Sequence, residues 1–400
     1  MRERLGINNT HLKNRNRGLA LQMIATEFPL SRIDISRRTG LTKMAVTNIV
    51  NEMIDEGFVV EKETAETFTV GRNPVILDIS DTSPYAIGLY ISRSQVSVIA
   101  TNLKLNLCYQ ESTDLMNETS ETLIEKLYTL TDRAIAYQKQ NNPYTYPLGI
   151  GISAIGPLDS AKGYILNPRQ FFNINDLPIV SLIQNRYNIP VFLENDMNAA
   201  ALAEKLFGSG KPYSNFIYMG ITNGIGSGII TDGKLYQGTS GFVGEIGHIS
   251  IKYDGELCDC GSRGCLELYA NMPVVLQKLR EITQDYSILP QDFERLSKLD
   301  NCRKILDDMT DKLSIALTNA VNLFDPECII IGHEGYYLPN KYLIKMQEYI
   351  QTHILSSGYK VIPVVASSFR DKAALYGSAC TVLQKLFEGH VFSTANSASM

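Results

Sequence analysis

The stretch that most constrains this chain lies between residues 241 and 267 and reads GFVGEIGHISIKYDGELCDCGSRGCLE. It brings one histidine and three cysteines within 18 residues: His248, Cys258, Cys260 and Cys265. Thiolate sulfur and imidazole nitrogen are ligands that Zn2+ prefers, and these spacings let a single loop fold onto one ion. Four protein ligands leave no open coordination position, so the pattern predicts a structural, tetrahedral zinc site and not a catalytic one.

The other four cysteines, Cys108, Cys302, Cys328 and Cys380, are widely spaced in apolar surroundings. Seven cysteines is an odd number, which argues against a disulfide framework, and we interpret the scattered four as small buried side chains. No apolar run approaches the roughly 20 residues of a membrane span, and the N-terminus lacks the apolar segment of a signal peptide. We therefore expect a cytoplasmic protein without a membrane partner.

Length and charge distribution predict several domains. At 400 residues the chain exceeds what one hydrophobic core usually organises, so we expect two or three. The whole chain has a formal net charge of −5, yet residues 1–43 contain nine Lys/Arg and three Asp/Glu, a local charge of +6. A basic leading segment on an acidic body is typical of a protein whose front end meets a polyanion.

Residues 1–80 have the element order of a winged helix-turn-helix domain. Apolar residues recur at helical spacing between residues 14 and 28. Ser31 is the expected cap of a short helix, 32–38, in which Ile33 and Ile35 face inward, and Gly40 ends it. A third helix then runs to Gly57, and the runs FVVEKE and FTVGRNPVILDI predict a hairpin.

The third helix is the predicted recognition helix of this domain. Its N-terminal half presents the polar residues expected to contact base edges and phosphates of double-stranded operator DNA: Thr42, Lys43, Thr47 and Asn48. Arg72, in the second strand of the hairpin, is expected to enter a narrow minor groove. The alternative is a small helical subdomain with a solvated polar face. The basic excess, the turn glycine and the hairpin together favour DNA binding.

Beyond a polar linker at residues 80–84, strand-like and helical patterns alternate to the end of the chain. Several of the strands end in Gly-rich or polar loops of the kind that bind ligands. This pattern predicts a two-lobed α/β domain with a cleft between the lobes.

Three stretches of this body are specific: GISAIGPLDSAKGYILNP, ENDMNAAALAE and GEIGHISIKYDGELCDCGSRGCLE. With them, residues from about 84 to 386 resemble the ROK family of sugar kinases and sugar-responsive repressors. The resemblance implies an actin-like, hexokinase-like domain, 84–400, in which lobe 1 comprises about 84–200 plus 372–386 and lobe 2 about 201–371. The predicted fold is therefore α/β: a winged helix-turn-helix followed by a two-lobed ROK domain with a structural zinc loop, as in the repressor branch of the family.

The resemblance also implies a sugar site. Asn195, Asp196, Glu245, His248 and Glu267 stand at the positions where the family contacts sugar hydroxyls, and Asp196 corresponds to the catalytic base of the kinases. Charged acceptors and an amide suit a ring that offers several hydroxyls. His248 is expected to serve both metal and sugar, one ring nitrogen for each. The alternative reading, helix caps and surface charges, suits Asp196 at a helix start but not Glu245 and Glu267 beside a metal loop.

The phosphate-binding loop of the family's kinases is not retained. Those enzymes use Asp-x-Gly-Gly-Thr in the first hairpin, whereas this chain reads GLYISRSQ, with Tyr90 at the Asp position and Ser92, Arg93 and Ser94 in place of Gly-Gly-Thr. A second Gly-rich bend, residues 222–228, remains permissive for phosphate but also suits a tight hairpin. We therefore expect sugar binding without phosphoryl transfer, and no catalytic residue.

The sequence thus predicts a sugar-responsive transcriptional repressor of carbohydrate-utilisation genes, acting as a homodimer or a tetramer. Two alternatives stay open: an active ATP-dependent sugar kinase with a DNA-binding appendage, and a repressor controlled by a phosphosugar or a protein partner. The sequence does not specify the sugar, the operator, or whether the sugar acts as inducer or co-repressor.

Overall fold

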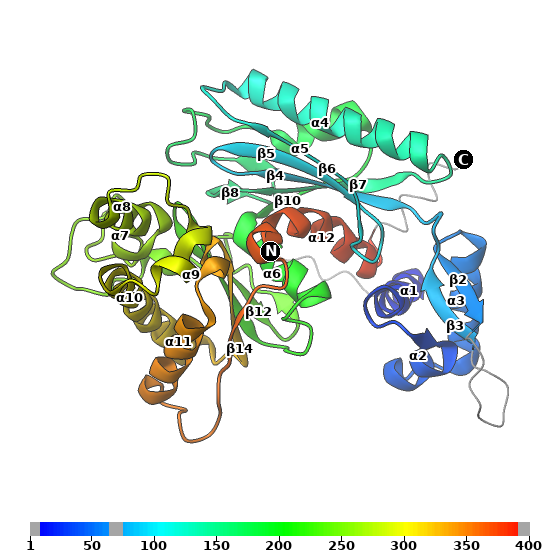
Figure 1. Cartoon of the computed structure of the whole chain (residues 1–400). Helices are drawn as coiled ribbons and strands as arrows, with labels where there is room; N and C mark the ends of the chain where they lie inside the picture. The colour runs from blue at the N-terminus through cyan, green and yellow to red at the C-terminus, as the bar shows by residue number, and fades with distance from the viewer. Residues whose placement is uncertain (1–8, 64–74, 391–400) are drawn as a thin grey trace. The chain divides into compact units, whose positions relative to one another are not determined.

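The computed structural model describes residues 9–63 and 75–390. These residues form two compact units: unit 1 is the chain up to Glu194 together with the segment from Ser378 onward, and unit 2 is Asn195–Gly377. Figure 1 shows the elements of both units. No helix in the described ranges is both long enough and apolar enough to cross a bilayer.

Unit 1 begins with three helices and a small sheet, in the predicted order. Helix α1 (Asn9–Thr26) precedes strand β1 (Leu30–Ser31), helices α2 (Arg32–Thr39) and α3 (Lys43–Asp55), and strands β2 (Val59–Glu63) and β3 (Val75–Ile79). The sheet order is β1-β3-β2, with antiparallel pairing throughout. Residues 64–74, where the sequence predicts the wing with Arg72, lie outside the described residues.

Local capping explains where the short helix α2 starts and stops. The Ser31 side chain accepts a hydrogen bond from Asp34 N, the Asp34 carboxylate accepts one from Ser31 N, and Gly40 ends the helix at a φ of 71°. The expectation that Ile33 faces inward is wrong: Ile35 is buried, but Ile33 is 56% exposed. Ile33 lies two residues from Ile35, so on a helix the two side chains face different sides.

The rest of unit 1 is a five-stranded sheet with helices. Its strands are β4 (Tyr85–Ile91), β5 (Gln95–Thr101), β6 (Leu107–Asp114), β7 (Pro147–Ala154) and β10 (Val191–Asn195), in the spatial order β10-β7-β4-β5-β6. Helices α4 (Ser120–Asn141) and α5 (Ile179–Tyr187), the part of α12 (Ala373–Phe387) from Ser378 onward and a small hairpin, β8 (Leu158–Asp159) with β9 (Tyr164–Ile165), complete it. Strands β4, β5 and β7 are buried almost continuously, as expected of strands covered on both faces, whereas β6 at the edge of the sheet has no buried residue.

Unit 2 has a second sheet with the same strand order. Strands β11 (Phe216–Ile221), β12 (Ile225–Thr231), β13 (Lys234–Leu235), β14 (Cys328–His333) and β15 (Val364–Ala366) are arranged as β13-β12-β11-β14-β15. In both sheets the first three strands are antiparallel and the fourth pairs parallel to the first. The mixed α/β fold predicted from the alternating pattern is confirmed, and its two halves share one topology.

The helices of unit 2 form its core with the second sheet. They are α6 (Asp196–Phe207), α7 (Glu267–Ala270), α8 (Met272–Thr283), α9 (Phe293–Leu296), α10 (Asp300–Phe324) and α11 (Asn340–His353), with short 3-10 turns η1 (Ile246–His248), η2 (Pro290–Asp292), η3 (Glu334–Tyr337) and η4 (Arg370–Lys372). Apolar side chains of α8, α10 and α11 cluster with those of β11 and β14.

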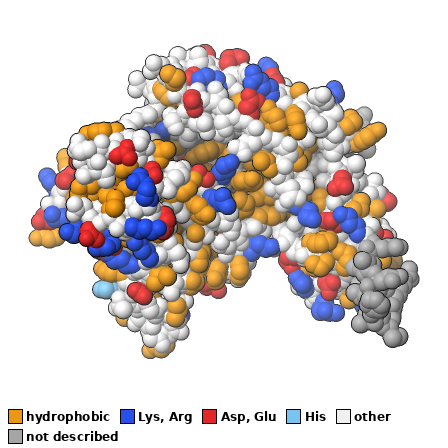
Figure 2. All heavy atoms as spheres, in the orientation of Figure 1, with side chains coloured by type: hydrophobic (Ala, Val, Ile, Leu, Met, Phe, Trp, Pro, Cys, Tyr) orange, Lys and Arg blue, Asp and Glu red, His pale blue; other side chains and the backbone are white. Residues whose placement is uncertain are grey.

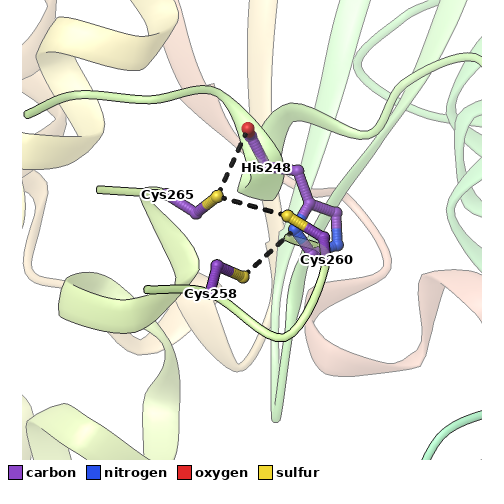
Figure 3. A group of neighbouring side chains, drawn as sticks. All are labelled: His248, Cys258, Cys260 and Cys265. Atoms are coloured by element: carbon purple, nitrogen blue, oxygen red, sulfur yellow. Dashed lines mark hydrogen bonds between the residues drawn. The ribbon is translucent and has the colours of Figure 1, made fainter. Parts of the chain in front are cut away.

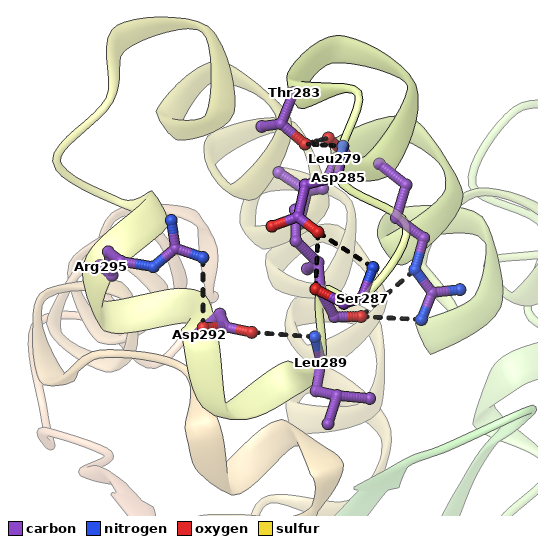
Figure 4. Close-up of polar contacts among 9 residues, drawn as sticks. Leu279, Thr283, Asp285, Ser287, Leu289, Asp292 and Arg295 are labelled. Atoms are coloured by element: carbon purple, nitrogen blue, oxygen red, sulfur yellow. Dashed lines mark hydrogen bonds and ion pairs between the residues drawn. The ribbon is translucent and has the colours of Figure 1, made fainter.

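The connection between α8 and α9 is fixed by its own polar groups (Figure 4). Asp285 accepts hydrogen bonds from the backbone and the hydroxyl of Ser287, at 3.0 and 2.6 Å, and Asp292 accepts one from Leu289 N at 3.0 Å. The Arg280 guanidinium donates to the Ile288 carbonyl. These contacts satisfy backbone groups that the loop would otherwise leave unpaired.

Candidate metal centre and sugar site

The four predicted metal ligands come together in unit 2 (Figure 3). The nitrogen and sulfur atoms of His248, Cys258, Cys260 and Cys265 all lie within 4.8 Å of one another. Cys258 Sγ is 3.8 Å from His248 Nδ1, and the sulfurs of Cys260 and Cys265 are 3.6 Å apart. A tetrahedral zinc ion with Zn–S distances near 2.3 Å separates two sulfur ligands by about 3.8 Å. The donor set and its spacing therefore fit a metal ion.

The loop that carries the cysteines is shaped by backbone pairing around two glycines. Isolated bridges join Ser250 to Cys265 and Leu257 to Arg263. Between them Cys258 N donates to the Ser262 carbonyl at 2.8 Å, and Gly261 adopts a φ of 93° that a residue with a Cβ rarely takes. The sequence CDCGSRGC therefore folds back within a few residues, which brings its first and last cysteines to the same point.

The surroundings of the thiols differ, and so do their pKa values. A backbone hydrogen bond from Ser262 lowers the pKa of Cys260, which is exposed, to about 6. Burial raises the pKa of Cys265, which has no exposed surface, to about 12. Metal binding requires thiolates, so an ion at this point would displace the proton of Cys265.

Glu267 connects the metal loop to the Gly-rich bend. It follows Cys265 by two residues, begins α7, and accepts a hydrogen bond at Oε2 from Ile225 N at 3.1 Å. Two further bonds join the same segments, from Met272 N to the Thr222 carbonyl and from Asn271 Nδ2 to the Asn223 carbonyl. Glu267, which is expected to contact the sugar, therefore also holds the start of β12 through this hydrogen bond.

The glycines of the 222–228 bend serve close packing. A Cβ at Gly224 would lie 2.8 Å from Glu267 Oε2, one at Gly226 would lie 2.9 Å from Met197 Cγ, and one at Gly228 would collide with the Met197 carbonyl. Because these three positions lack a Cβ, α6 and the metal loop can pack directly against the backbone of the bend and of β12. The sequence had left open whether these glycines serve phosphate or a tight hairpin, and packing accounts for all three.

Glu245 lies at the entry to the metal loop. Ser227 N and Oγ both donate to the carbonyl of Gly244, its neighbour, at 2.8 and 2.9 Å. Part of Glu245 is exposed, but the surrounding protein takes water away from its carboxylate and so raises its pKa. The nearby His248 lowers that pKa, and the nearby Glu267 raises it further. Two acids and an imidazole therefore share one electrostatic environment beside the bend.

Asn195 and Asp196 stand where β10 of unit 1 passes into α6 of unit 2. Asn195 caps α6: its side chain accepts hydrogen bonds from Met197 N at 2.9 Å and Asn198 N at 3.4 Å. Asp196 is buried in the first turn, where the positive end of the helix stabilises a carboxylate. The alternative role of helix cap, considered for Asp196 from the sequence, is therefore filled by its neighbour Asn195.

The predicted DNA contacts are arranged along the start of α3. Thr42 caps the helix by accepting from Ala45 N, and Thr47 donates to the Lys43 carbonyl, while Thr42, Lys43 and Asn48 are exposed. Much of the nearby basic charge is neutralised by Arg17–Glu56, Arg32–Glu61 and Arg38–Glu27 ion pairs, and Figure 2 shows acidic and basic side chains interspersed. Lys43 makes no ion pair with another residue of the described ranges, and it is exposed.

The chain matches the model of the ROK family over residues 86–385. It belongs to that family. It is 32% identical over 384 residues to the xylose repressor of Bacillus subtilis, covering 95% of this chain and 97% of that one. A solved ROK family transcriptional regulator, a homologue of the Escherichia coli Mlc protein, superposes with a TM-score of 0.81 at 25% identity, covering 96% and 98% of the two chains. A ROK hexokinase from Thermus thermophilus matches with a TM-score of 0.63 at 26% identity, but covers 74% of this chain and 97% of its own.

One polar pair inside unit 2 was not predicted from the sequence. His333, at the end of β14, is 3% exposed, and its Nδ1 lies 2.8 Å from the Tyr218 hydroxyl of β11. Its Nε2 has no hydrogen-bond partner among the residues that the structure describes, and burial lowers the pKa of the ring to about 4. The sequence gives no sign that this histidine will meet Tyr218. The contact depends on how β11 and β14 align, with Ile221 opposite His333.

Proposed function

We propose that this protein is a DNA-binding transcriptional repressor of carbohydrate-utilisation genes whose operator affinity falls when a sugar binds to unit 2. The observation that carries the proposal is the extent of its similarity. The match to named xylose repressors and to a ROK transcriptional regulator runs through both the N-terminal helices and the ROK domain, whereas the hexokinase match covers about three quarters of the chain.

The sugar contacts we propose are Asn195, Asp196, Glu245, His248 and Glu267. Their support is that β12 contacts all the segments that carry them: Met197 packs on Gly228, Gly244 accepts from Ser227, and Glu267 accepts from Ile225 N. We take xylose as the first sugar to test, because the xylose repressors match this chain at 29% and 32% identity, whereas the Mlc and NagC regulators match a similar share of it at 26%.

Zinc is the metal we propose for the four-ligand centre. Three thiolates and one imidazole suit Zn2+, and a closed set of four protein ligands makes the ion structural. When bound, zinc would hold the loop between Glu245 and Glu267 in one conformation. His248 presents Nδ1 to the sulfurs, and we propose that its Nε2 faces the sugar.

We propose that the protein does not phosphorylate the sugar. In the first hairpin Ser92 bonds to Gln95 across the turn, and Arg93 donates to the Arg169 carbonyl, so these side chains are engaged in local contacts where the kinases carry glycines and threonine. Zinc-loaded protein with ATP, magnesium and xylose, glucose or N-acetylglucosamine should form no sugar phosphate. Turnover at about 1 s−1 or faster would support the kinase alternative instead.

The proposed repressor acts as a homodimer that spans two operator half-sites separated by whole turns of DNA. To test this, operators are selected from random duplexes with the full chain, and their affinity is measured by fluorescence anisotropy with and without each sugar. One sugar should weaken operator binding by about tenfold to a hundredfold, a coupling of about 1.4 to 2.7 kcal/mol. If no duplex is enriched, the proposal is refuted; if operators bind but no sugar changes their affinity, control by a phosphosugar or a protein takes its place.

A further inference from the structure

Helix α12 is a single unbroken helix that belongs to both units. It spans Ala373–Phe387, and the boundary between the units falls inside it, after Gly377. Along its length it meets other elements at three junctions, and at each junction a glycine removes the side chain between two backbones. These junctions are with α6 near its start, with strands β4 and β7 in its middle, and with α1 at its end.

The first junction ties α12 to the helix that begins with Asp196. A Cβ at Gly377 would collide with the carbonyl of Ala199 and would lie 2.8 Å from Ala200 N. Ala199 lies in the first turn of α6, three residues after Asp196. A displacement of that turn would therefore press directly on the backbone of α12.

The second junction fixes α12 on the sheet of unit 1. A Cβ at Gly88 of β4 would lie 2.7 Å from Ala379 N, and one at Gly151 of β7 would collide with the Ser378 carbonyl. Close-packed contacts of this kind are stiff, since no flexible side chain is present to absorb a shift. The middle of α12 therefore has little freedom to move independently of the sheet.

The third junction joins α12 to the DNA-binding helices. A Cβ at Gly18 of α1 would lie 2.7 Å from the carbonyl carbon of Phe387, and one at Gly389 would lie 2.7 Å from the Asn14 carbonyl. Helix α1 is in turn bonded to the end of α3: buried Arg17 donates to Glu56 at 2.8 Å, and Lys13 pairs with Glu52 at 2.8 Å. The end of α12 thus lies one helix away from α3.

We propose that α12 is the element that couples the sugar site to the recognition helix, through the sequence α6, α12, α1, α3. The inference rests on the proposed function, because it assumes that unit 2 binds sugar and that α3 binds DNA. Sugar at the start of α6 favours one position of α12, and the Gly18 junction passes that position to α1. Both ligands then bias one packed element, which is the physical requirement for coupling between sites.

Besides the chain between β3 and β4, a rival connection between the DNA-binding part and the sheet of unit 1 is an ion cluster around the buried Asp78. Asp78 of β3 pairs with Lys104, in the turn after β5, at 2.9 Å and with Lys62 of β2 at 2.7 Å. Long lysine side chains at partly exposed positions adapt to small movements, so this cluster should hold the parts together without transmitting a defined shift.

The test compares Gly18→Ala with two controls in the full zinc-loaded chain. Gly358→Ala makes the same change where no atom of the described residues lies within 4 Å of the new Cβ, and Lys104→Ala breaks the Asp78–Lys104 ion pair. For each protein, xylose affinity is measured with and without the selected operator, and operator affinity with and without xylose, or with whichever sugar releases wild-type protein.

Wild type and both controls should show a ratio of about ten to a hundred between the two affinities of each ligand. In Gly18→Ala both ratios should fall to one, within about twofold. This variant should still bind one zinc per chain, and its sugar affinity without DNA should equal that of wild type. A Gly18→Ala ratio equal to that of wild type, or loss of coupling only in Lys104→Ala, overturns the inference. A wild type that ignores every sugar refutes the proposed function itself.

Hydrogen exchange on wild-type protein gives a second measurement that does not depend on any variant folding. Saturating sugar without DNA should change the exchange of amides in α12 and α1 together. A change in α1 with none in α12 would show that the signal takes another route.

Discussion

Replacing Cys260 by serine should remove the metal and disturb the sugar site together. Cys260 is the exposed member of the cluster, so its loss creates no buried cavity, and the main effect is on the ion. A serine hydroxyl is a poor substitute for a thiolate on zinc, and three remaining ligands leave an open position. Because the loop between Cys258 and Cys265 leads straight into Glu267, release of the ion should also loosen the hydrogen bond from Ile225 N.

The size of the effect follows from binding linkage. If free zinc exceeds its dissociation constant about a thousandfold, the ion stabilises the folded protein by about 4 kcal/mol. Unit 2, residues 195–377, contains 183 residues, and for a domain of this size each kcal/mol shifts the melting temperature by about 2–4 °C. Cys260→Ser should therefore lower the melting temperature of unit 2 by about 8–16 °C.

The assay combines zinc content by atomic absorption, thermal unfolding and sugar titration calorimetry. Cys108→Ser is the matched control. The expectation that all four scattered cysteines are buried is wrong for Cys108, which is exposed like Cys260 but lies on β6 of unit 1, far from the cluster in the sequence. It should keep one zinc per chain and wild-type sugar affinity. A Cys260→Ser protein that lost its zinc and still bound sugar like wild type would separate the metal from the sugar site and refute the reasoning.

Three further predictions follow from single residues. Asp196→Asn should weaken sugar binding at least about tenfold, since it removes the charge that accepts a sugar hydroxyl, and leave operator binding without sugar unchanged; calorimetry and anisotropy would detect either failure. Lys43→Ala should weaken binding to all duplexes alike and lower the slope of log affinity against log salt by about one, whereas an unchanged slope would mean that Lys43 meets no phosphate. Burial holds the pKa of His333 near 4 against an ordinary 6.5, so the unfolded chain takes up a proton first and stability is lost as pH falls from 6.5 towards 4. Between pH 7.5 and 5.5 the free energy of unfolding measured in urea should fall by about 1.4 kcal/mol because of His333. This loss should be absent in His333→Asn, since asparagine tolerates the φ of 51° at this position. It should remain in the surface control His353→Gln.

Several features of this protein could be predicted from the sequence because their determinants are close together in the chain. The metal cluster lies within 18 residues, so its spacing and its glycines already restrict the loop. The caps Ser31 and Gly40 act on their own helix, and the alternation of strand and helix patterns reports burial on both faces of a sheet. These are local signals, and local energetics decide them.

What only the tertiary structure decided concerns residues far apart in sequence. Nothing near Gly18 or Gly377 in the chain shows that one lies against Phe387 and the other against Ala199. The same holds for Glu267 at Ile225 N and for His333 at Tyr218. Periodicity tells which face of an element is apolar, as it does for Ile35, but which partner that face meets depends on the packing of the whole chain. The sequence therefore determined the four candidate metal ligands, and the fold determined which segments pack around the loop that carries them.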